Sequence, residues 1–421
     1  MLQSQIPPKL LRRFVTVLCV ALAACWSAAA SAQDMVGLYL TWVRDPSTTV
    51  VVNWVDLYPD SSDAVYYRQA GEKEWRAGKA KRTRVVPSAL QRRHLELEGL
   101  KPDTVYELAV AKKPEKAEEA WTFRTMPAEL NRPVRFITGG DMMHNRRMLD
   151  RMSAHVGGLE PDFVMFGGDM AYENGANATK IVDFLQSWME YGVGNDRRLI
   201  PVVAVIGNHE VRGGYGGKVP VDAPYYYGLY SLPDGTAYYT LDFGKYLSLI
   251  ALDSGHTNEI PGEQAAWLDR ALAARHGQTF LFACYHYPAY GTTKAPTGRR
   301  PIDAPRSIEL RRHWVPLFDR HGVTAVFEND HHNFKRTHPL RGDRRDDKNG
   351  ILYLGDGCWG VEPRTVPKPG TAWWLAKAAP RNHFWIVDLL PNKKVTVRAM
   401  GRNGKVFDEV KLPAPRTRPM D

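Results

Sequence analysis

The chain has 421 residues, of which 44% are hydrophobic and 24% are charged, with only four cysteines. This length suits two or three domains, and the composition excludes collagen-like, disordered and disulfide-dense chains. The 56 Lys and Arg against 46 Asp and Glu give a formal net charge of +10. That excess alone is compatible with nucleic acid, a membrane surface or a phosphate-bearing small molecule as partner.

Residues 1–32 are predicted to be a signal peptide. Lys9, Arg12 and Arg13 precede an apolar stretch over residues 14–24, and small residues follow as far as Ala32. A basic segment, a short apolar core and an Ala-x-Ala end are typical of secretory signals. The apolar stretch is shorter than the about 20 residues that a spanning helix needs, so a retained anchor is the less favoured alternative. Cleavage after Ala32 would remove three of the ten excess positive charges.

Two details of this segment bear on how the protein is exported and where it is located afterwards. Residues 22–25 (Leu-Ala-Ala-Cys) resemble a bacterial lipobox, which would leave a lipid anchor on Cys25. The Arg12-Arg13 pair resembles a twin-arginine signal. We therefore expect a periplasmic or secreted protein, with no transmembrane segment in the rest of the chain. Cleavage would leave Cys284 and Cys358, so at most one intramolecular disulfide is possible.

Residues 35–127 are predicted to form a small all-β domain. Short stretches rich in β-branched and aromatic residues alternate there with turns, without a helical period. These stretches are residues 36–42, 49–54, 64–67, 93–97, 105–110 and 120–125. Such spacing indicates an antiparallel β-sandwich. Residues 97–106 resemble a turn of a fibronectin type III-like domain, with Tyr106 as a tyrosine corner, and a packing role without chemistry is the simplest interpretation.

From residue 132 to residue 412 the pattern changes to alternating strands and helices. Apolar strands over residues 134–138, 163–166 and 202–206 each end in a glycine-containing polar turn. Repeated units of this kind predict an α/β domain with parallel strands. An amphipathic helix should open within residues 261–268. Strands near 384–387 and 395–397 are expected to complete the second sheet of an αββα sandwich built from two mixed sheets.

Polar side chains follow five of these predicted strands at their carboxyl ends. They are Asp141, Asp169, the pair Asn208-His209, His286 and the cluster at residues 328–332. Ligands bind at the carboxyl edge of α/β sheets. Each of these polar clusters alone is more often a simple turn or a helix cap than a ligand. Together, carboxylates, imidazoles and an amide oxygen form the donor set for a pair of metal ions.

These motifs resemble those of the purple acid phosphatase-like metallophosphoesterases, members of the calcineurin-like superfamily. The family's blocks are GDxG, GDxxY, GNH(D/E), VxxH and GHxH. The corresponding segments here are GDMM at 140–143, GDMAY at 168–172, GNHE at 207–210, ACYH at 283–286 and NDHH at 329–332. Met143 thus replaces a glycine, and Asp330 replaces a histidine. The resemblance extends to the fibronectin type III-like domain in front.

The resemblance implies a dinuclear metal site. Asp141, Asp169, Tyr172 and His332 would hold one metal, and Asp169, as a shared bridge, Asn208, His286 and Asp330 would hold the second. A bridging carboxylate reduces the repulsion between two close cations. The Tyr172 phenolate would suit Fe(III), and the second site Fe(II), Mn(II) or Zn(II).

The departures from the family pattern leave alternatives open. Asp330 could bind the second metal as a carboxylate, which would favour a harder ion. It could instead turn away, so that His331 takes its place or only the first metal binds. Met143 reduces the backbone freedom beside Asp141, and His144 could enter the site.

The resemblance also implies an activity, the hydrolysis of phosphate monoesters by attack of a metal-bound hydroxide. His209 would donate a proton to the leaving alcohol, and Glu210 would orient His209. One alternative is a phosphodiesterase on nucleotides or phospholipids. Another is a secreted binding protein with a degenerate metal site.

Basic loops could contribute to substrate binding. Residues 212–218 follow the third motif, and Lys294, Arg299 and Arg300 follow the fourth. Either loop could bind phosphate or simply be solvated. Neither interleaves aromatic and basic residues as single-stranded nucleic-acid sites do. The expected partner is therefore a small phosphate ester, not nucleic acid.

Overall fold

The computed structural model describes most of the chain after the predicted signal peptide. The described residues are 35–57, 62–111, 120–143, 145–214, 218–292, 304–368 and 370–412. The predicted signal peptide with Cys25, the residue His144, and the basic residues Lys294, Arg299 and Arg300 lie outside them. Among the described residues, no helix combines the length and the apolar character that a membrane crossing requires.

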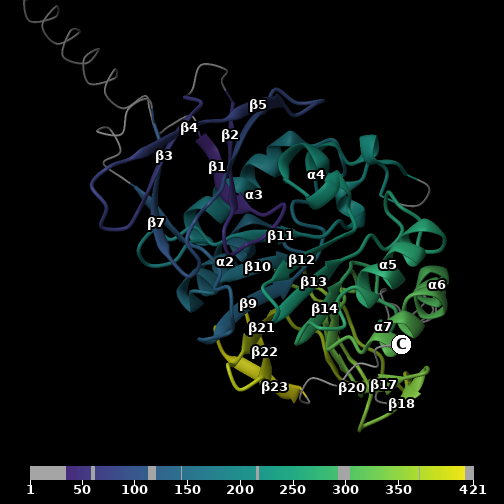
Figure 1. The fold of residues 1–421 in the computed structure, drawn as a ribbon. Helices are drawn as coiled ribbons and strands as arrows, with labels where there is room; N and C mark the ends of the chain where they lie inside the picture. Colours follow the sequence, from purple (N-terminus) through teal and green to yellow (C-terminus); the bar gives the residue numbers. More distant parts are fainter. Residues whose placement is uncertain are drawn as a thin grey trace, which may run out of the picture.

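The first part of the chain folds into two four-stranded antiparallel sheets, which confirms the all-β prediction (Figure 1). One sheet has the order β1-β2-β6-β5, and the other β4-β3-β7-β8. The strands are β1 (Met35–Thr41), β2 (Val50–Asp56), β3 (Ala64–Gln69), β4 (Arg76–Lys79), β5 (Lys81–Arg84), β6 (Gln91–Leu97), β7 (Val105–Val110) and β8 (Trp121–Arg124). The hydroxyl of Tyr106 accepts a hydrogen bond from the Lys101 amide at 2.9 Å, as a tyrosine corner requires.

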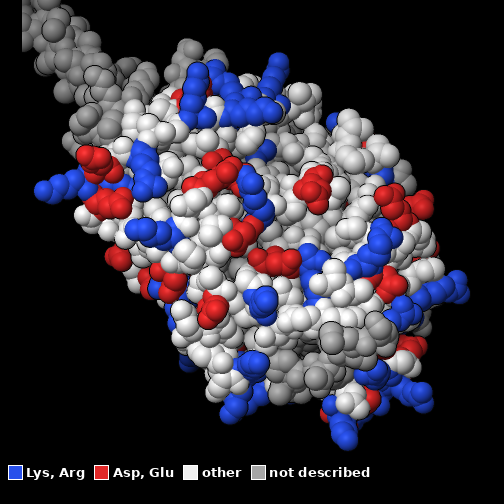
Figure 2. All heavy atoms as spheres, viewed as in Figure 1, with Lys and Arg blue, Asp and Glu red and all other residues white. Residues whose placement is uncertain are grey.

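One basic surface of the protein lies on this domain, at β4 and β5. All four residues of β5, Lys-Arg-Thr-Arg, are exposed, and β5 is an edge strand of its sheet. Figure 2 shows lysine and arginine side chains gathered on the surface where β4 and β5 lie in Figure 1. Charged side chains on an edge strand prevent it from pairing with another chain. Edge protection therefore accounts for this basic surface without an anionic partner.

The second part contains two mixed sheets. The first has the order β11-β10-β9-β21-β22-β23, in which β9, β10 and β11 are parallel to one another. Its strands are β9 (Val134–Gly139), β10 (Phe163–Phe166), β11 (Val202–Ala204), β21 (His383–Leu389), β22 (Val395–Gly401) and β23 (Val406–Leu412). The prediction that the strands near 384–387 and 395–397 complete the second sheet is wrong. The almost wholly buried β21 instead lies inside the first sheet, antiparallel to β9.

The second sheet has the order β12-β13-β14-β15-β19-β16-β20. Strands β13, β14, β15 and β19 run parallel to their neighbours in this group. The strands are β12 (Tyr239–Phe243), β13 (Leu247–Ala251), β14 (Phe280–Cys284), β15 (Ala325–Phe327), β16 (Phe334–Thr337), β19 (Leu352–Gly355) and β20 (Leu375–Ala379). A small hairpin, β17 (Leu340–Arg341) and β18 (Arg344–Arg345), projects from it.

The two sheets pack face to face, with helices outside them. The ring of Phe136 on β9 lies 5.5 Å from Phe282 on β14 and 6.1 Å from Phe327 on β15. Helices α2 and α3 lie near the first sheet, and α5, α6 and α7 near the second (Figure 1). Their bounds are α2 (Arg146–Leu159), α3 (Ala178–Tyr191), α5 (Glu263–Ala273), α6 (Pro305–His313) and α7 (Val315–His321). Because the polar turns follow strands of both sheets, the predicted site lies at the shared edge of the sandwich.

The front domain packs directly against the α/β domain. The indole of Trp42 meets Phe163 and Phe243 edge-on, at 5.9 and 5.6 Å. The hydroxyl of Tyr39 donates to the carbonyl of Leu229 at 2.6 Å. Leu229 ends the short helix α4 (Pro224–Leu229), which contacts the 3₁₀ turn η2 (Asn208–Glu210). The front domain thus supports the turn that carries Asn208 and His209.

Candidate metal centre

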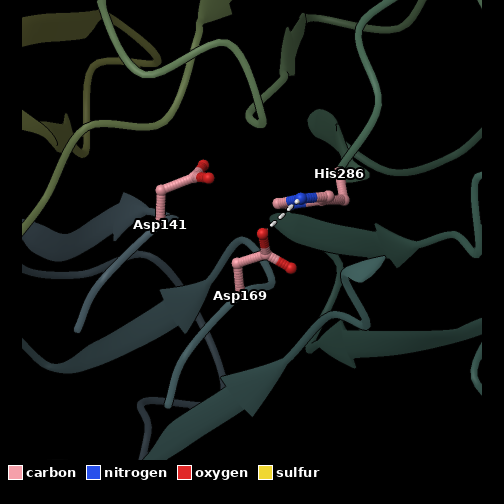
Figure 3. Close-up of side chains that lie close together, drawn as sticks. All are labelled: Asp141, Asp169 and His286. Atoms are coloured by element: carbon pink, nitrogen blue, oxygen red, sulfur yellow. Dashed lines mark ion pairs between the residues drawn. The ribbon is translucent and has the colours of Figure 1, made fainter. Parts of the chain in front are cut away.

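The structure brings the sequence-predicted site residues together at the carboxyl ends of β9, β10, β11, β14 and β15. All seven predicted metal ligands are buried, from 0% exposure for Asp141 and His286 to 9% for His332. Asp141, Asp169 and His286 each place one ligand atom within 4.8 Å of the others. In Figure 3 their side chains point toward one another from both sheets of the sandwich. Carboxylate and imidazole groups arranged in this way could bind a metal ion.

The ligands predicted for the first metal form a compact group. His332 Nε2 lies 2.9 Å from Asp141 Oδ1. The hydroxyl of Tyr172 lies 3.0 Å from the same Asp141 oxygen and 3.1 Å from His332 Nε2. The three ligand atoms therefore lie around one point, where a metal ion could bind. Their chemistry, a carboxylate, a phenol and an imidazole, is that of the predicted ferric site.

The ligands predicted for the second metal lie beside this group. His286 Nε2 is 3.3 Å from Asp169 Oδ2 and 3.8 Å from Asp330 Oδ1. The backbone amide of Asp330 donates to Asp141 Oδ2 at 2.8 Å. The Asp330 carboxylate thus faces His286 instead of turning away, which favours the carboxylate alternative. Ligation by Asp330 itself stays a prediction.

Unsatisfied buried atoms provide a test of whether these residues fit metal ions. Asp169 Oδ2, Asn208 Oδ1 and His286 Nε2 are buried and form no hydrogen bond. A buried polar atom without a partner costs roughly 1–3 kcal/mol. The other ring nitrogen, His286 Nδ1, is 2.9 Å from the Gly167 carbonyl, an arrangement that directs Nε2 into the site. All three of these atoms belong to the set predicted for the second metal, so the residues fit a cation there.

The electrostatics of the site also favour positive charge at its centre. Burial raises the pKa of Tyr172 well above its usual value, and the neighbouring Asp141, Asp169 and Asp330 carboxylates raise it further. Burial lowers the pKa of His286, but the same carboxylates outweigh this and bring it to about 10. Three carboxylates crowded in a buried space are costly unless cations neutralise them. Two bound cations would provide that neutralisation.

The backbone at the site is unusual. Five of the seven predicted ligands have φ in the left-handed region: 58° for Asp141, 53° for Asp169, 58° for Tyr172, 74° for Asp330 and 57° for His332. Such values are uncommon for residues other than glycine, especially for a bulky tyrosine. Backbone strain of this kind concentrates at functional sites, where the surrounding structure maintains it. The strain is therefore an independent indication that these turns have a function.

Glycines provide the space that these turns need. A Cβ on Gly168, where φ is 89°, would lie 2.7 Å from His286 Nδ1. A Cβ on Gly357, where φ is 61°, would lie 1.9 Å from Asp141 Oδ2. Both positions therefore require glycine for conformation and for close approach.

His209 stands at the more open side of the site. Its side chain is 32% exposed, and its Nε2 lies 3.9 Å from Asp169 Oδ2. Its Nδ1 lies 2.5 Å from Asn174 Oδ1, and its ring packs on Tyr172 at 4.3 Å. Burial lowers the pKa of His209, with Asp169 and Asp141 opposing the shift. His209 is thus held with Nε2 facing the predicted metals.

The expected role of Glu210 is wrong. Its carboxylate accepts hydrogen bonds from the backbone amides of Gly207, Asp169 and Met170, at 2.7, 2.7 and 2.8 Å. Because these bonds use both carboxylate oxygens, Glu210 fixes the two turns that carry Asp169 and Asn208. The residue that holds the His209 ring is Asn174, which sequence reasoning missed. A loop asparagine two positions after Tyr172 carries no recognisable signal.

The other residues that the sequence singled out differ in their burial. Met143 is buried at 4% exposure and packs in the main core. Arg212 is exposed and Lys218 is partly exposed in the loop after η2. Sequence reasoning did not consider Arg364, whose amide donates to the His332 carbonyl at 2.8 Å. It also missed the charged cluster of Glu328, Lys335 and Asp356 behind the site.

The fold is of the metallophosphoesterase type, with an all-β domain in front. Residues 135–332 match the calcineurin-like phosphoesterase family, and residues 35–125 match the purple acid phosphatase N-terminal domain. Together the two matches span more than half of the chain. The chain thus combines a calcineurin-like phosphoesterase domain with a purple acid phosphatase N-terminal domain, and the resemblance noted in the sequence is confirmed.

Two curated relatives and one solved structure are similar to this chain. Two uncharacterized proteins from two strains of Mycobacterium tuberculosis are 27% identical over 354 residues. The match spans 73% of this chain and 63% of each relative, so the chain covers less than two thirds of their length. A purple acid phosphatase from yellow lupin seeds has a similar structure, with a TM-score of 0.72 and 15% identity over 89% of this chain and 73% of the lupin chain. At that identity the likeness shows the fold alone, and it confirms the predicted fold class.

Proposed function

We propose that the protein is an exported phosphoesterase that hydrolyses phosphate monoesters with a dinuclear metal centre. The observation that carries this proposal is the group of buried ligand atoms of Asp169, Asn208 and His286, none of which forms a hydrogen bond, beside Asp141. Family membership supports a phosphoric ester hydrolase of acid phosphatase type. The preference for monoesters over diesters is supported by the family resemblance.

The two proposed metal positions would be held by different residues of the chain. Asp141, Tyr172 and His332 would hold the first ion, Asn208, His286 and Asp330 the second, and Asp169 would bridge them. Two bound cations would lower the pKa of water and neutralise charge on the phosphoryl group. The phenol of Tyr172 favours Fe(III) in the first position, and Fe(II), Mn(II) or Zn(II) suits the second.

His209 is suited to handle the proton of the leaving group. Because Asn174 engages Nδ1, the Nε2 atom remains directed toward the site. Its partial exposure lets a substrate reach it, unlike the buried His286. A histidine in this position can donate a proton to the leaving alcohol or bind a phosphoryl oxygen.

Elemental analysis combined with an ester screen tests the proposal. The purified mature protein should contain two metals per chain and should hydrolyse a phosphate monoester faster than the matching diester. Faster diester hydrolysis would support the phosphodiesterase alternative. One metal or none, without hydrolysis of either ester, would support a binding protein with a degenerate site.

Export is supported by residues 1–32. Cell fractionation should find the protein in the periplasm or in the medium, and mass spectrometry should find an N-terminus after Ala32. A diacylglycerol-modified Cys25 at the N-terminus would indicate a lipid anchor instead. A cytoplasmic protein that retains Met1 would contradict the export proposal.

A further inference from the structure

The residue after Asp330 lies between two carboxylates. His331 Nε2 is 3.7 Å from Asp330 Oδ2, and His331 Nδ1 is 3.6 Å from Asp356 Oδ2. The ring is buried at 6% exposure. Gly291 provides the space for it, since a Cβ there would lie 2.4 Å from His331 Cε1. His331 therefore has a defined place in the fold.

The two oxygens of Asp330 face different partners. Oδ1 lies 3.8 Å from Nε2 of His286, on the side of the predicted second metal. Oδ2 lies on the opposite side, toward His331. A carboxylate in this position can offer one oxygen to a metal while a neighbouring group restrains the other. Such outer partners fix the orientation of metal ligands.

Behind His331 lies a charged cluster that is closed to solvent. Lys335 Nζ is 2.7 Å from Asp356 Oδ1, forms a second ion pair with Glu328 Oε2, and donates to the Tyr290 carbonyl at 2.6 Å. The side chains of Lys335, Glu328 and Asp356 are all 0% exposed. Buried charges of this kind are tolerated only when they are paired and hydrogen-bonded. Each charge in the cluster is paired, and Asp356 Oδ2 accepts hydrogen bonds from the amide and the hydroxyl of Thr292 at 2.8 and 3.0 Å, which fixes its position.

The cluster also connects the loops that carry the predicted ligands. Glu328 Oε1 accepts the Tyr285 hydroxyl at 2.7 Å and the Ala289 amide at 2.6 Å, on either side of His286. The Asp356 carbonyl accepts the His332 amide at 2.9 Å. His331 thus lies 3.6 Å from a unit that is itself tied to the turns of His286 and His332.

We propose that His331 is a positioning residue for the second metal site. Held between Asp356 and Asp330, it restrains Asp330 Oδ2 and so directs Oδ1 toward the metal. This inference rests on the proposed dinuclear centre. It gives a reason why a carboxylate can stand in this chain where the family uses a histidine.

Metal binding tests the inference without reference to activity. Metal-stripped wild-type protein and its His331→Phe variant are titrated with Mn²⁺ and with Zn²⁺ by calorimetry. Phenylalanine keeps the ring in the space beside Gly291 but removes both nitrogens. The second metal equivalent should bind about 10–100-fold more weakly in the variant, the usual cost of losing an outer partner of a ligand. The first equivalent should bind with unchanged affinity, and His313→Phe on α6 is the matched control.

A double-mutant cycle with Asp330→Asn separates positioning from a general structural role. If His331 acts through Asp330, adding His331→Phe to Asp330→Asn should cause little further loss of second-site affinity. Additive losses, equal weakening of both metals, or wild-type affinity in His331→Phe would overturn the inference. His331→Gln, which retains a donor, should recover part of the affinity and replaces the Phe variant if that one does not fold. A wild-type protein that binds fewer than two metals would instead refute the proposed function.

Discussion

His286 Nε2 and Asp169 Oδ2 lie 3.3 Å apart, although His286 follows a strand of one sheet and Asp169 a strand of the other. Neither atom forms a hydrogen bond, and both are buried. The contact thus joins the two halves of the sandwich at the point where their carboxyl ends meet. A cation between the sheets would satisfy both atoms. Metal binding and the packing of the two sheets should therefore depend on each other.

Asp169→Asn should remove both metals or weaken both strongly. The bridging role requires a carboxylate with two anionic oxygens, and an amide supplies only one neutral oxygen. Metal content should fall from two per chain toward zero in elemental analysis, and hydrolysis of a phosphate monoester should fall at least about 100-fold. Asp347→Asn, at an exposed position, is the control and should retain both metals. A variant that keeps two tightly bound metals would refute the bridge.

Tyr172→Phe should remove any visible charge-transfer colour. The Tyr172 hydroxyl faces Asp141 and His332, and only a phenolate on ferric iron would give such a band. The absorption spectrum of the iron-loaded protein checks this, with Tyr227→Phe as a control that should keep its colour. Wild-type protein that binds no iron under these conditions would refute the ferric assignment while leaving a dinuclear site of other metals open.

His209→Ala should reduce kcat by about 100- to 10,000-fold if His209 transfers the leaving-group proton. Metal content should not change, since the His209 ring is not a predicted ligand. Asn174→Ala should have a smaller effect on kcat, because the ring would remain but lose its fixed orientation. Glu210→Gln, in contrast to the two substitutions above, should lower metal affinity. The Glu210 carboxylate accepts hydrogen bonds from the backbone amides of Asp169 and Gly207, whose turns carry predicted ligands. Unchanged turnover in His209→Ala would remove its catalytic role.

The elements that carry the site could be predicted from the sequence because their signals are local. The strand before Asp141 is mostly apolar, the strand before Asp169 is a continuous apolar segment, and glycines mark the ends of both. Strand β5 could not be predicted in the same way. Its residues are Lys-Arg-Thr-Arg and all are exposed, so neither apolar content nor alternation identifies it.

Other features depend on contacts that no local pattern contains. The assignment of β21 to the first sheet depends on its pairing with β9, more than 240 positions earlier in the chain. Asn174 meets His209 only because two loops converge. The Glu328–Lys335 pair did leave a trace in the sequence, since both charged residues flank the NDHH motif closely. That trace can be interpreted only once both side chains are known to be buried.

His383 should make the protein less stable in acid. It is 2% exposed on β21, and burial lowers its pKa from 6.5 to about 4. Between these two pH values the unfolded chain binds a proton that the folded chain does not, so stability decreases as pH falls from 6.5 to 4. The full effect is about 3 kcal/mol. Thermal unfolding midpoints at pH 7.5 and pH 4.5 should therefore differ less in His383→Gln than in the wild type. The control His313→Gln should keep the wild-type difference, and an unchanged difference in His383→Gln would show that His383 is not the group responsible.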